Sequence, residues 1–171
     1  MDIKIVEYEE RHKEAVCVLF DNFQDYLVNL DPIKRLRRMS GYAENVLNET
    51  LKDIKDNDGI FLLAEDDSKV IGFIVGKMEK RTEGQLLEAY PALMGRITEL
   101  YVDSNYRSKG IGSMLMLQLE NYFKEKNCEY IWVDVFKPNT TASNFYKKFD
   151  YEDRDIEMIK RLKHSQQVPV S

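Results

Sequence analysis

Apolar and polar residues alternate at the start of the chain and then recur every three to four positions. Residues 3–8 alternate as a half-buried strand does, and in residues 11–30 the apolar side chains share one helical face. Asp31 precedes Pro32, and the residue before a proline avoids the helical conformation, so the first helix should end there. A second helical period covers residues 42–54. The chain therefore begins with a strand and two helices.

A hairpin is predicted next. Two apolar runs, residues 60–64 and 70–78, are separated by the polar turn 65–68, which is the pattern of paired strands. Gly72 and Gly76 lie inside the second run. Glycine inside a strand indicates a bulge or a close approach of another part of the protein.

The second half of the chain alternates strands with helices after a stretch without a clear period, residues 82–95, which we expect to be a mobile loop with a helical turn. The expected strands are 96–102, 130–136 and 151–162, and the expected helices are 110–126 and 140–149. Strand 130–136 is apolar enough to be central in a sheet. This order predicts an α/β (α+β) mixed sheet in a single domain, residues 1–164, with a frayed tail at 165–171.

Composition narrows the class of protein. The 171 residues are 43% hydrophobic and 32% charged, as in ordinary globular proteins, and the formal charge of −5 argues against general nucleic-acid binding. The chain shows neither an apolar run long enough to cross a membrane nor a signal peptide, so we expect a cytoplasmic protein. Cys17 and Cys128 form no CxxC pair and have no histidine at metal-ligand spacing, which favours two buried, reduced thiols and no metal site.

The turn at residues 103–109 joins the strand 96–102 directly to an amphipathic helix. The first amides of a helix lack partners within the helix and carry partial positive charge. Gly110 and Gly112 remove the β-carbons that would keep a diphosphate away from those amides, and Arg107 and Lys109 add formal positive charge. The turn therefore predicts a diphosphate site; the alternative is a plain glycine turn with Ser108 as the N-cap.

Two motifs carry a family resemblance. The GxxxxGK[ST] phosphate loop is absent, and GxGxxG fails at Leu115, but Arg107-x-x-Gly110-x-Gly112 resembles the acyl-CoA signature of the GNAT acetyltransferase superfamily. Residues 138–149 resemble the Asn-x-x-Ala-x-x-Phe-Tyr segment of the same family. The family often has glycine where this chain has Asp150, and aspartate tolerates the left-handed conformation better than most residues.

The resemblance, which extends from Ile3 to Leu162, implies a mixed sheet with splayed central strands flanked by helices, and acetyl-CoA as the co-substrate. Pantetheine would bond to the backbone of Leu100, Tyr101 and Val102. The diphosphate would be held by the amides of Arg107, Ser108, Lys109, Gly110, Ile111, Gly112 and Ser113. Asn139 is expected to contact the pantetheine arm or to cap a helix. Lys148 is expected to reach the 3′-phosphate or to be solvated.

Two residues are the expected catalytic groups. An amine must lose a proton before it attacks the thioester, and the departing thiolate benefits from a proton donor. The resemblance makes Tyr146 the general acid; its alternative is a core position, since it shares one helical face with Phe145. Glu99 is the expected base, acting directly or through a water. Its alternative is a solvated or substrate-contacting glutamate. An amide near Val102 is expected to stabilise the oxyanion.

The amine acceptor is not disclosed by the sequence. Tyr26, Glu83 and Tyr90 are the expected acceptor-site residues, with Phe23 and Glu88 beside them, and each has an alternative as an ordinary surface or core residue. The basic run 33–38 is expected to meet the CoA phosphates or an acidic partner, or to be a solvated helix face.

The sequence thus predicts an N-acetyltransferase acting on a small amine or on a peptide or protein amine, with no nucleic-acid or membrane partner. The alternative is a non-catalytic acyl-CoA-binding or sensing module. The family resemblance also implies a homodimer through the C-terminal strands.

Overall fold

The computed structural model describes residues 2–162. By internal contacts the chain divides into two compact units, Met1–Pro138 and Asn139–Ser171, and each is described by itself below. The single domain expected over residues 1–164 stays a prediction. The expected tail at 165–171 lies outside the described residues.

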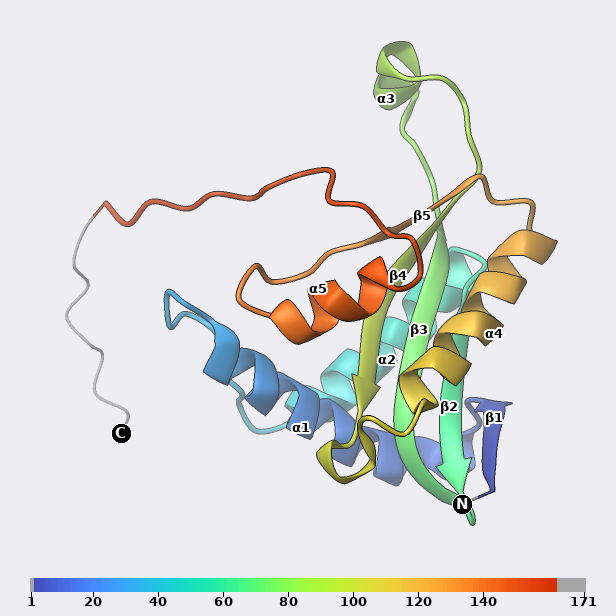
Figure 1. Ribbon diagram of the computed structural model, residues 1–171, viewed down its shortest axis with the longest axis vertical. Helices are drawn as coiled ribbons and strands as arrows, with labels where there is room; N and C mark the ends of the chain where they lie inside the picture. Colours follow the sequence, from blue (N-terminus) through green and yellow to red (C-terminus); the bar gives the residue numbers. More distant parts are fainter. Residues whose placement is uncertain (1, 163–171) are drawn as a thin grey trace. The chain divides into compact units, whose positions relative to one another are not determined.

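The first unit is built on a five-stranded mixed sheet with the order β1-β2-β3-β4-β5. The strands are β1 Ile3–Glu7, β2 Ile60–Asp66, β3 Lys69–Glu79, β4 Met94–Val102 and β5 Tyr130–Val133. The first three pairings are antiparallel, and β4 pairs with β5 in parallel (Figure 1). The mixed α/β fold expected from the hydrophobic pattern is confirmed.

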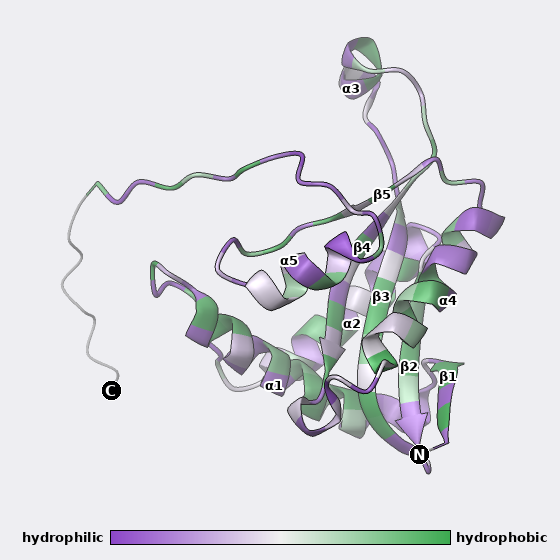
Figure 2. Ribbon diagram, viewed as in Figure 1, coloured by the Kyte–Doolittle hydropathy of each residue, from purple (hydrophilic) through white to green (hydrophobic). Residues whose placement is uncertain are grey.

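Helices cover both faces of this sheet (Figure 1). The covering helices are α1 Lys13–Leu30, α2 Tyr42–Asp56 and α4 Ile111–Glu125, while the short α3 Glu83–Glu88 lies on an arm that extends away from the sheet. The 3-10 turns are η1 Glu10–His12 and η2 Ser104–Tyr106. α1 and α2 pack on the face that carries Phe73 and Val75, and α4 packs on the face that carries Gly76. Figure 2 shows hydrophobic stretches along β2 and β3, whereas the helices carry both hydrophilic and hydrophobic residues, as layered packing requires.

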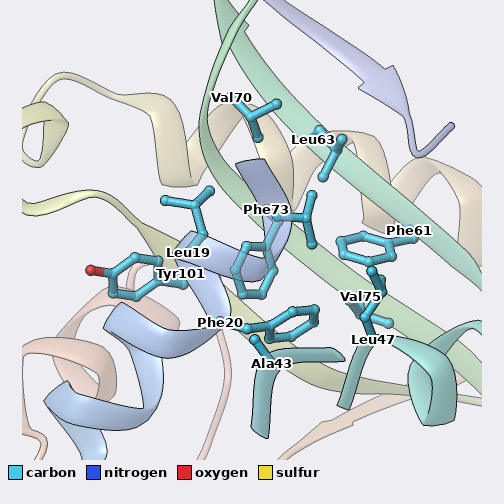
Figure 3. Close-up of a cluster of buried hydrophobic side chains, with 11 residues drawn as sticks. Leu19, Phe20, Ala43, Leu47, Phe61, Leu63, Val70, Phe73, Val75 and Tyr101 are labelled. Carbon is cyan, nitrogen blue, oxygen red and sulfur yellow. The ribbon is translucent and has the colours of Figure 1, made fainter. Parts of the chain in front are cut away.

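Aromatic rings dominate the core between the sheet and α1–α2 (Figure 3). Phe20 of α1 lies 4.9 Å from Phe73 of β3 and 6.1 Å from Phe61 of β2, measured between ring centroids. Tyr101 of β4 stands at the border of the cluster, and Figure 3 shows its hydroxyl directed away from the phenylalanines. The core thus fixes the C-terminal half of β4 against α1.

Gly95 allows α4 to pack directly on the sheet. A β-carbon at this position would lie 2.6 Å from the fully buried ring of Phe123. Because that ring is enclosed, we expect Gly95→Ala to lower the free energy of unfolding by about 1–3 kcal/mol. Gly84→Ala in α3 is the matched control, since the nearest atom to its added methyl group is 4.0 Å away. Urea unfolding of both variants measures the difference, and equal stabilities would contradict this account of the packing.

The second unit contains one helix, α5 Thr140–Lys147, among its described residues. The Asn139 side chain caps it by accepting a hydrogen bond from the Ala142 amide at 3.1 Å, so the capping role is confirmed. Asp150 ends the region in the left-handed conformation, with φ of 62°, as its side chain permits.

The prediction of a strand at residues 151–162 is wrong, since these residues form neither a strand nor a helix. The apolar side chains that produced its pattern are largely exposed: Ile156, Met158, Ile159 and Leu162. A strand is defined by its ladder of hydrogen bonds to a neighbour, and an apolar alternation alone does not supply one.

Three smaller expectations also differ from the structure. β5 is an edge strand of the described sheet rather than a central one, because only β4 pairs with it. On α4 the buried aromatic residue is Phe123, while Tyr122 is half-buried and donates a hydrogen bond to the Asp58 carbonyl at 2.8 Å. The basic run 33–38 is a loop instead of a helix face. The carboxylate of Asp31 organises that loop by accepting backbone hydrogen bonds, and these hold the pKa of Asp31 below its ordinary value.

Candidate active site

A bulge in β4 marks the point where β4 and β5 separate. Val75 of β3 pairs with Glu99, and the next residue, Gly76, pairs with Ile97, so Thr98 has no partner in the β3 register. β5 pairs with β4 only up to Ile97. Residues 98–102 of β4 therefore extend past the last residue paired with β5, and β5 does not pair with this edge of the strand. A bulge of this kind bends a strand and ends its pairing.

Backbone groups on this edge face away from β3. The Asp103 amide donates to the Ile71 carbonyl at 2.9 Å, and alternate residues of an antiparallel strand direct their N–H and C=O groups to opposite sides. The groups of Leu100 and Val102 therefore point toward the side that β5 leaves. The Val102 carbonyl accepts a hydrogen bond from Arg107 Nε at 2.9 Å, which agrees with this direction.

The turn after β4 leads into the N-terminus of α4 through two left-handed residues. Ser108 has a φ of 60° and Gly110 has a φ of 82°. Gly110 is the N-cap of α4, so a plain cap by Ser108 is wrong. Because glycine has no side chain, it caps none of the first amides of the helix, those of Ile111, Gly112 and Ser113. Nothing lies within 4 Å of where a Gly110 β-carbon would be, so there is open space beside this N-cap.

The two basic side chains of the turn are held by aromatic rings. The Arg107 guanidinium lies 4.8 Å from the centroid of Tyr26 and 5.3 Å from that of Tyr101. Lys109 Nζ lies 5.1 Å from the centroid of Tyr106 and donates to the Asn105 carbonyl at 3.1 Å. Both charges thus stay beside the turn, and the guanidinium is directed to α1.

Glu99 follows the bulge and lies on the face covered by α1 and α2, as its partner Val75 does. Burial raises the pKa of its carboxyl, and this outweighs the hydrogen bond from the Thr98 hydroxyl, which lowers it. The Asp53 carboxylate raises the pKa further, although Lys77 Nζ binds Asp53 at 2.7 Å. A carboxyl group with a raised pKa beside an open strand edge has the property expected of a general base.

Among residues 139–162, the described part of the second unit, Tyr146 is the most buried, with 8% of its surface exposed. Burial raises the pKa of its phenol, so the hydroxyl keeps its proton at neutral pH. Its ring packs against Phe145 at 5.5 Å and Tyr151 at 5.5 Å, between centroids. The phenol can therefore act as a proton donor, and the ring also packs in the apolar part of this unit.

The sequence model of the acetyltransferase (GNAT) family matches residues 19–151. This stretch contains the bulged strand, the glycine turn, α4 and α5. The chain belongs to the GNAT acetyltransferase family.

Individual relatives agree with the family. An N-alpha-acetyltransferase of Sulfurisphaera tokodaii is 27% identical over 141 residues, which are 81% of this chain and 80% of that protein. An uncharacterized N-acetyltransferase of Methanocaldococcus jannaschii is 36% identical over 97 residues, or 56% of this chain; the match spans about half of that relative, 54%. The structure of AAC(6')-Iy in complex with the bisubstrate analog CoA-S-monomethyl-acetylneamine has a TM-score of 0.68 at 16% identity, covering 95% of this chain and 99% of that one. The family and the acetyltransferase class expected from the sequence are confirmed, and so is the use of an acyl-CoA.

The GNAT fold does not bring all the expected acceptor residues together. Tyr26 lies beside Arg107 at the C-terminal end of β4. Glu83 and Tyr90 precede the other end of this nine-residue strand, on the arm that carries α3, and Tyr90 is 94% exposed (Figure 1). A strand of that length spans about 30 Å.

Some features of this GNAT site could not be found from the sequence. The bulge at Thr98 has no residue signature, since it depends on the register of β3. Lys69, at the start of β3, lies 5.2 Å from the Tyr106 centroid, so Tyr106 contacts two ammonium groups at the turn. Lys69 is 40 residues from Lys109 in the chain, and only pairing of the strands reveals that the two are neighbours. Among residues 2–162 no metal-binding group of His, Cys, Asp and Glu is present, and no helix combines the length and apolar character needed to cross a bilayer.

Proposed function

We propose that this protein transfers an acetyl group from acetyl-CoA to a primary amine by direct attack of the amine on the thioester. The observation that carries the proposal is the unpaired edge of β4, residues 98–102, which leads into the uncapped N-terminus of α4. Few other ligands fit an extended strand edge followed by a diphosphate site. An extended pantetheine arm joined to a diphosphate has this shape.

The chain's own groups fit that co-substrate. The backbone of Leu100 and Val102 faces the unpaired edge, where it can bond to the amides of pantetheine. The amides of Ile111, Gly112 and Ser113 have no side-chain cap from Gly110 and carry partial positive charge, so they can stabilise a diphosphate. Main-chain amides of Arg107 to Gly110, in a turn with left-handed residues, resemble the anion-binding nests of other proteins. Asn139 and Lys148 stay predictions as further contacts.

The reaction needs one base and one acid. Acetyl-CoA supplies the acetyl thioester. We assign Glu99 to accept a proton from the amine nitrogen, directly or through a water, because its raised pKa brings it closer to neutral pH. We assign Tyr146 to hold the proton that the departing sulfur receives. An amide near Val102 would donate to the oxyanion.

The acceptor is a primary amine, and its class is to be found by experiment. A panel of polyamines, amino acids, aminoglycosides and peptides, assayed by release of CoA, separates the catalytic protein from a non-catalytic acyl-CoA-binding module. Transfer to at least one amine is the expected result. Tight acetyl-CoA binding without transfer to any amine would support the module. A cytoplasmic location and a homodimer stay predictions.

Gly110→Asp tests the diphosphate site. The new carboxylate would lie in front of the α4 amides, where it repels the diphosphate and competes for its hydrogen bonds. We expect acetyl-CoA binding, measured by calorimetry, to weaken by about 3 kcal/mol, or about 100-fold in Kd.

Gly110→Asn is the matched control. Asparagine has nearly the same shape as aspartate and tolerates the left-handed φ of 82° as well, but it carries no charge. We expect its Kd to remain within about tenfold of that of the wild type, because any backbone strain there is about 1 kcal/mol. The site assignment fails if the two variants bind acetyl-CoA equally well, or if the wild-type protein does not bind it.

A further inference from the structure

Arg107 connects the proposed diphosphate turn to α1. Its Nε donates to the Val102 carbonyl at 2.9 Å, and its guanidinium plane lies near two rings, Tyr26 of α1 and Tyr101 of β4. The guanidinium thus makes three contacts, one with a carbonyl and two with ring faces, even though the residue is exposed. The side chain thus spans the turn, the end of the strand and the helix.

The same region of α1 is fixed to β4 by a second contact. Phe23 lies one helical turn before Tyr26, and its ring is 5.4 Å from that of Tyr101, between centroids. Tyr101 is 7% exposed and also belongs to the core cluster, 6.0 Å from Phe73. Phe23, Tyr101 and the core therefore hold the middle of α1, while Arg107 joins Tyr26, one helical turn further on, to the turn before α4.

We propose that Arg107 is a positioning residue, which transmits occupation of the diphosphate turn to the last turns of α1 through the ring of Tyr26. The inference rests on the proposed function, because it requires acetyl-CoA to bind at this turn. In this arrangement the main-chain amides of the turn hold the diphosphate, and the Arg107 side chain acts on the helix.

The coupling acts through direct contacts from the turn to Arg107 and from Arg107 to Tyr26. A diphosphate bound by the amides fixes the backbone of residues 107–110, which in the free protein contains two left-handed residues and exposed side chains. Fixing the backbone of Arg107 fixes the origin of its side chain, and the Tyr26 ring then packs on a stationary guanidinium. Tyr26 and Phe23 are expected acceptor-site residues, so the helix that receives the amine would be ordered by the co-substrate before transfer.

Hydrogen exchange of the α1 amides, with and without acetyl-CoA, tests this coupling. In the wild type we expect saturating acetyl-CoA to slow the exchange of residues 23–30 about fivefold or more, the lower end of typical coupling between sites. Arg107→Met keeps the length of the side chain but removes the guanidinium, and Tyr26→Leu removes the ring. Both should reduce this slowing to less than about twofold. Tyr26→Phe keeps the ring and should retain the full effect.

Calorimetry with acetyl-CoA on the same variants separates the outcomes. The proposal expects the Kd of Arg107→Met to stay within about tenfold of the wild type, since main-chain amides hold the diphosphate. It is overturned if the slowing persists in Arg107→Met, or if Arg107→Met abolishes binding while Tyr26→Leu keeps both binding and slowing, which would make Arg107 a phosphate ligand. If the wild-type protein does not bind acetyl-CoA, the proposed function fails as well. That outcome differs from failure of the coupling alone, in which the wild type binds acetyl-CoA. Thermal unfolding confirms that each variant is folded.

Discussion

Glu99→Gln lowers kcat by about 100-fold or more if the carboxylate removes the proton of the amine, since general base catalysis contributes on the order of 10²–10⁴-fold. Burial and the nearby Asp53 carboxylate raise the pKa of Glu99 above its ordinary value of 4.5. A base works when deprotonated, so the rate of the wild type should rise as pH increases through this raised pKa. Glutamine cannot titrate, and the variant should lose this acidic limb of the pH–rate profile.

Folding provides an internal control for this variant. A carboxyl group with a raised pKa destabilises the folded state once pH exceeds its unfolded value, because the ionised form is the disfavoured one. Glutamine removes that charge while keeping the shape. The melting temperature of Glu99→Gln at pH 7 should therefore equal or exceed that of the wild type. An acidic limb that survives in the variant would exclude Glu99 as the base.

Tyr146→Phe should also reduce kcat by about 100-fold, with acetyl-CoA affinity unchanged. The substitution removes only the hydroxyl, and loss of a general acid typically costs 10²–10⁴-fold, or on the order of 3–5 kcal/mol. Because burial raises the pKa of the phenol, the hydroxyl remains protonated throughout the neutral range. Steady-state rates with the amine found by the panel, together with calorimetry, measure the two quantities.

Phe145→Tyr is the matched control for this substitution. It adds a hydroxyl to the half-buried neighbouring ring of α5 and leaves Tyr146 in place. We expect this variant to retain most of the wild-type kcat. If Tyr146→Phe turns over at the wild-type rate, the residue has a packing role only, in contact with Phe145 and Tyr151.

The local elements could be predicted well because their causes are local. Asp31 before Pro32 ended α1, Asn127 ended α4 in the left-handed conformation with φ of 58°, and Asn139 capped α5. Gly76 was expected to permit a close approach, and a β-carbon there would meet Leu119 at 2.6 Å. Each of these features depends on a few consecutive residues or on one missing side chain.

Features that depend on strand partners could not be predicted. The alternation at residues 151–162 looked like a strand, but no ladder pairs it within the described chain. Strand 130–136 was expected to be central from its apolar composition, whereas β5 is short and at the edge. The position of Arg107 at Tyr26 also depends on packing between elements far apart in the sequence.

The bulge at Thr98 changes which residues of β4 face each side of the sheet. Before it, Ile97 lies opposite Gly76 and faces α4; after it, Glu99 lies opposite Val75 and faces α1 and α2, although both residue numbers are odd. Deleting Thr98 would restore one-to-one pairing with β3 and keep Ile97 and Glu99 on their present faces, but it would remove the bend of the strand. The edge of residues 98–102, which is proposed to bind pantetheine, would then lose the bulge at which β4 leaves β5. The length of this one strand is thus as constrained as the identity of its residues.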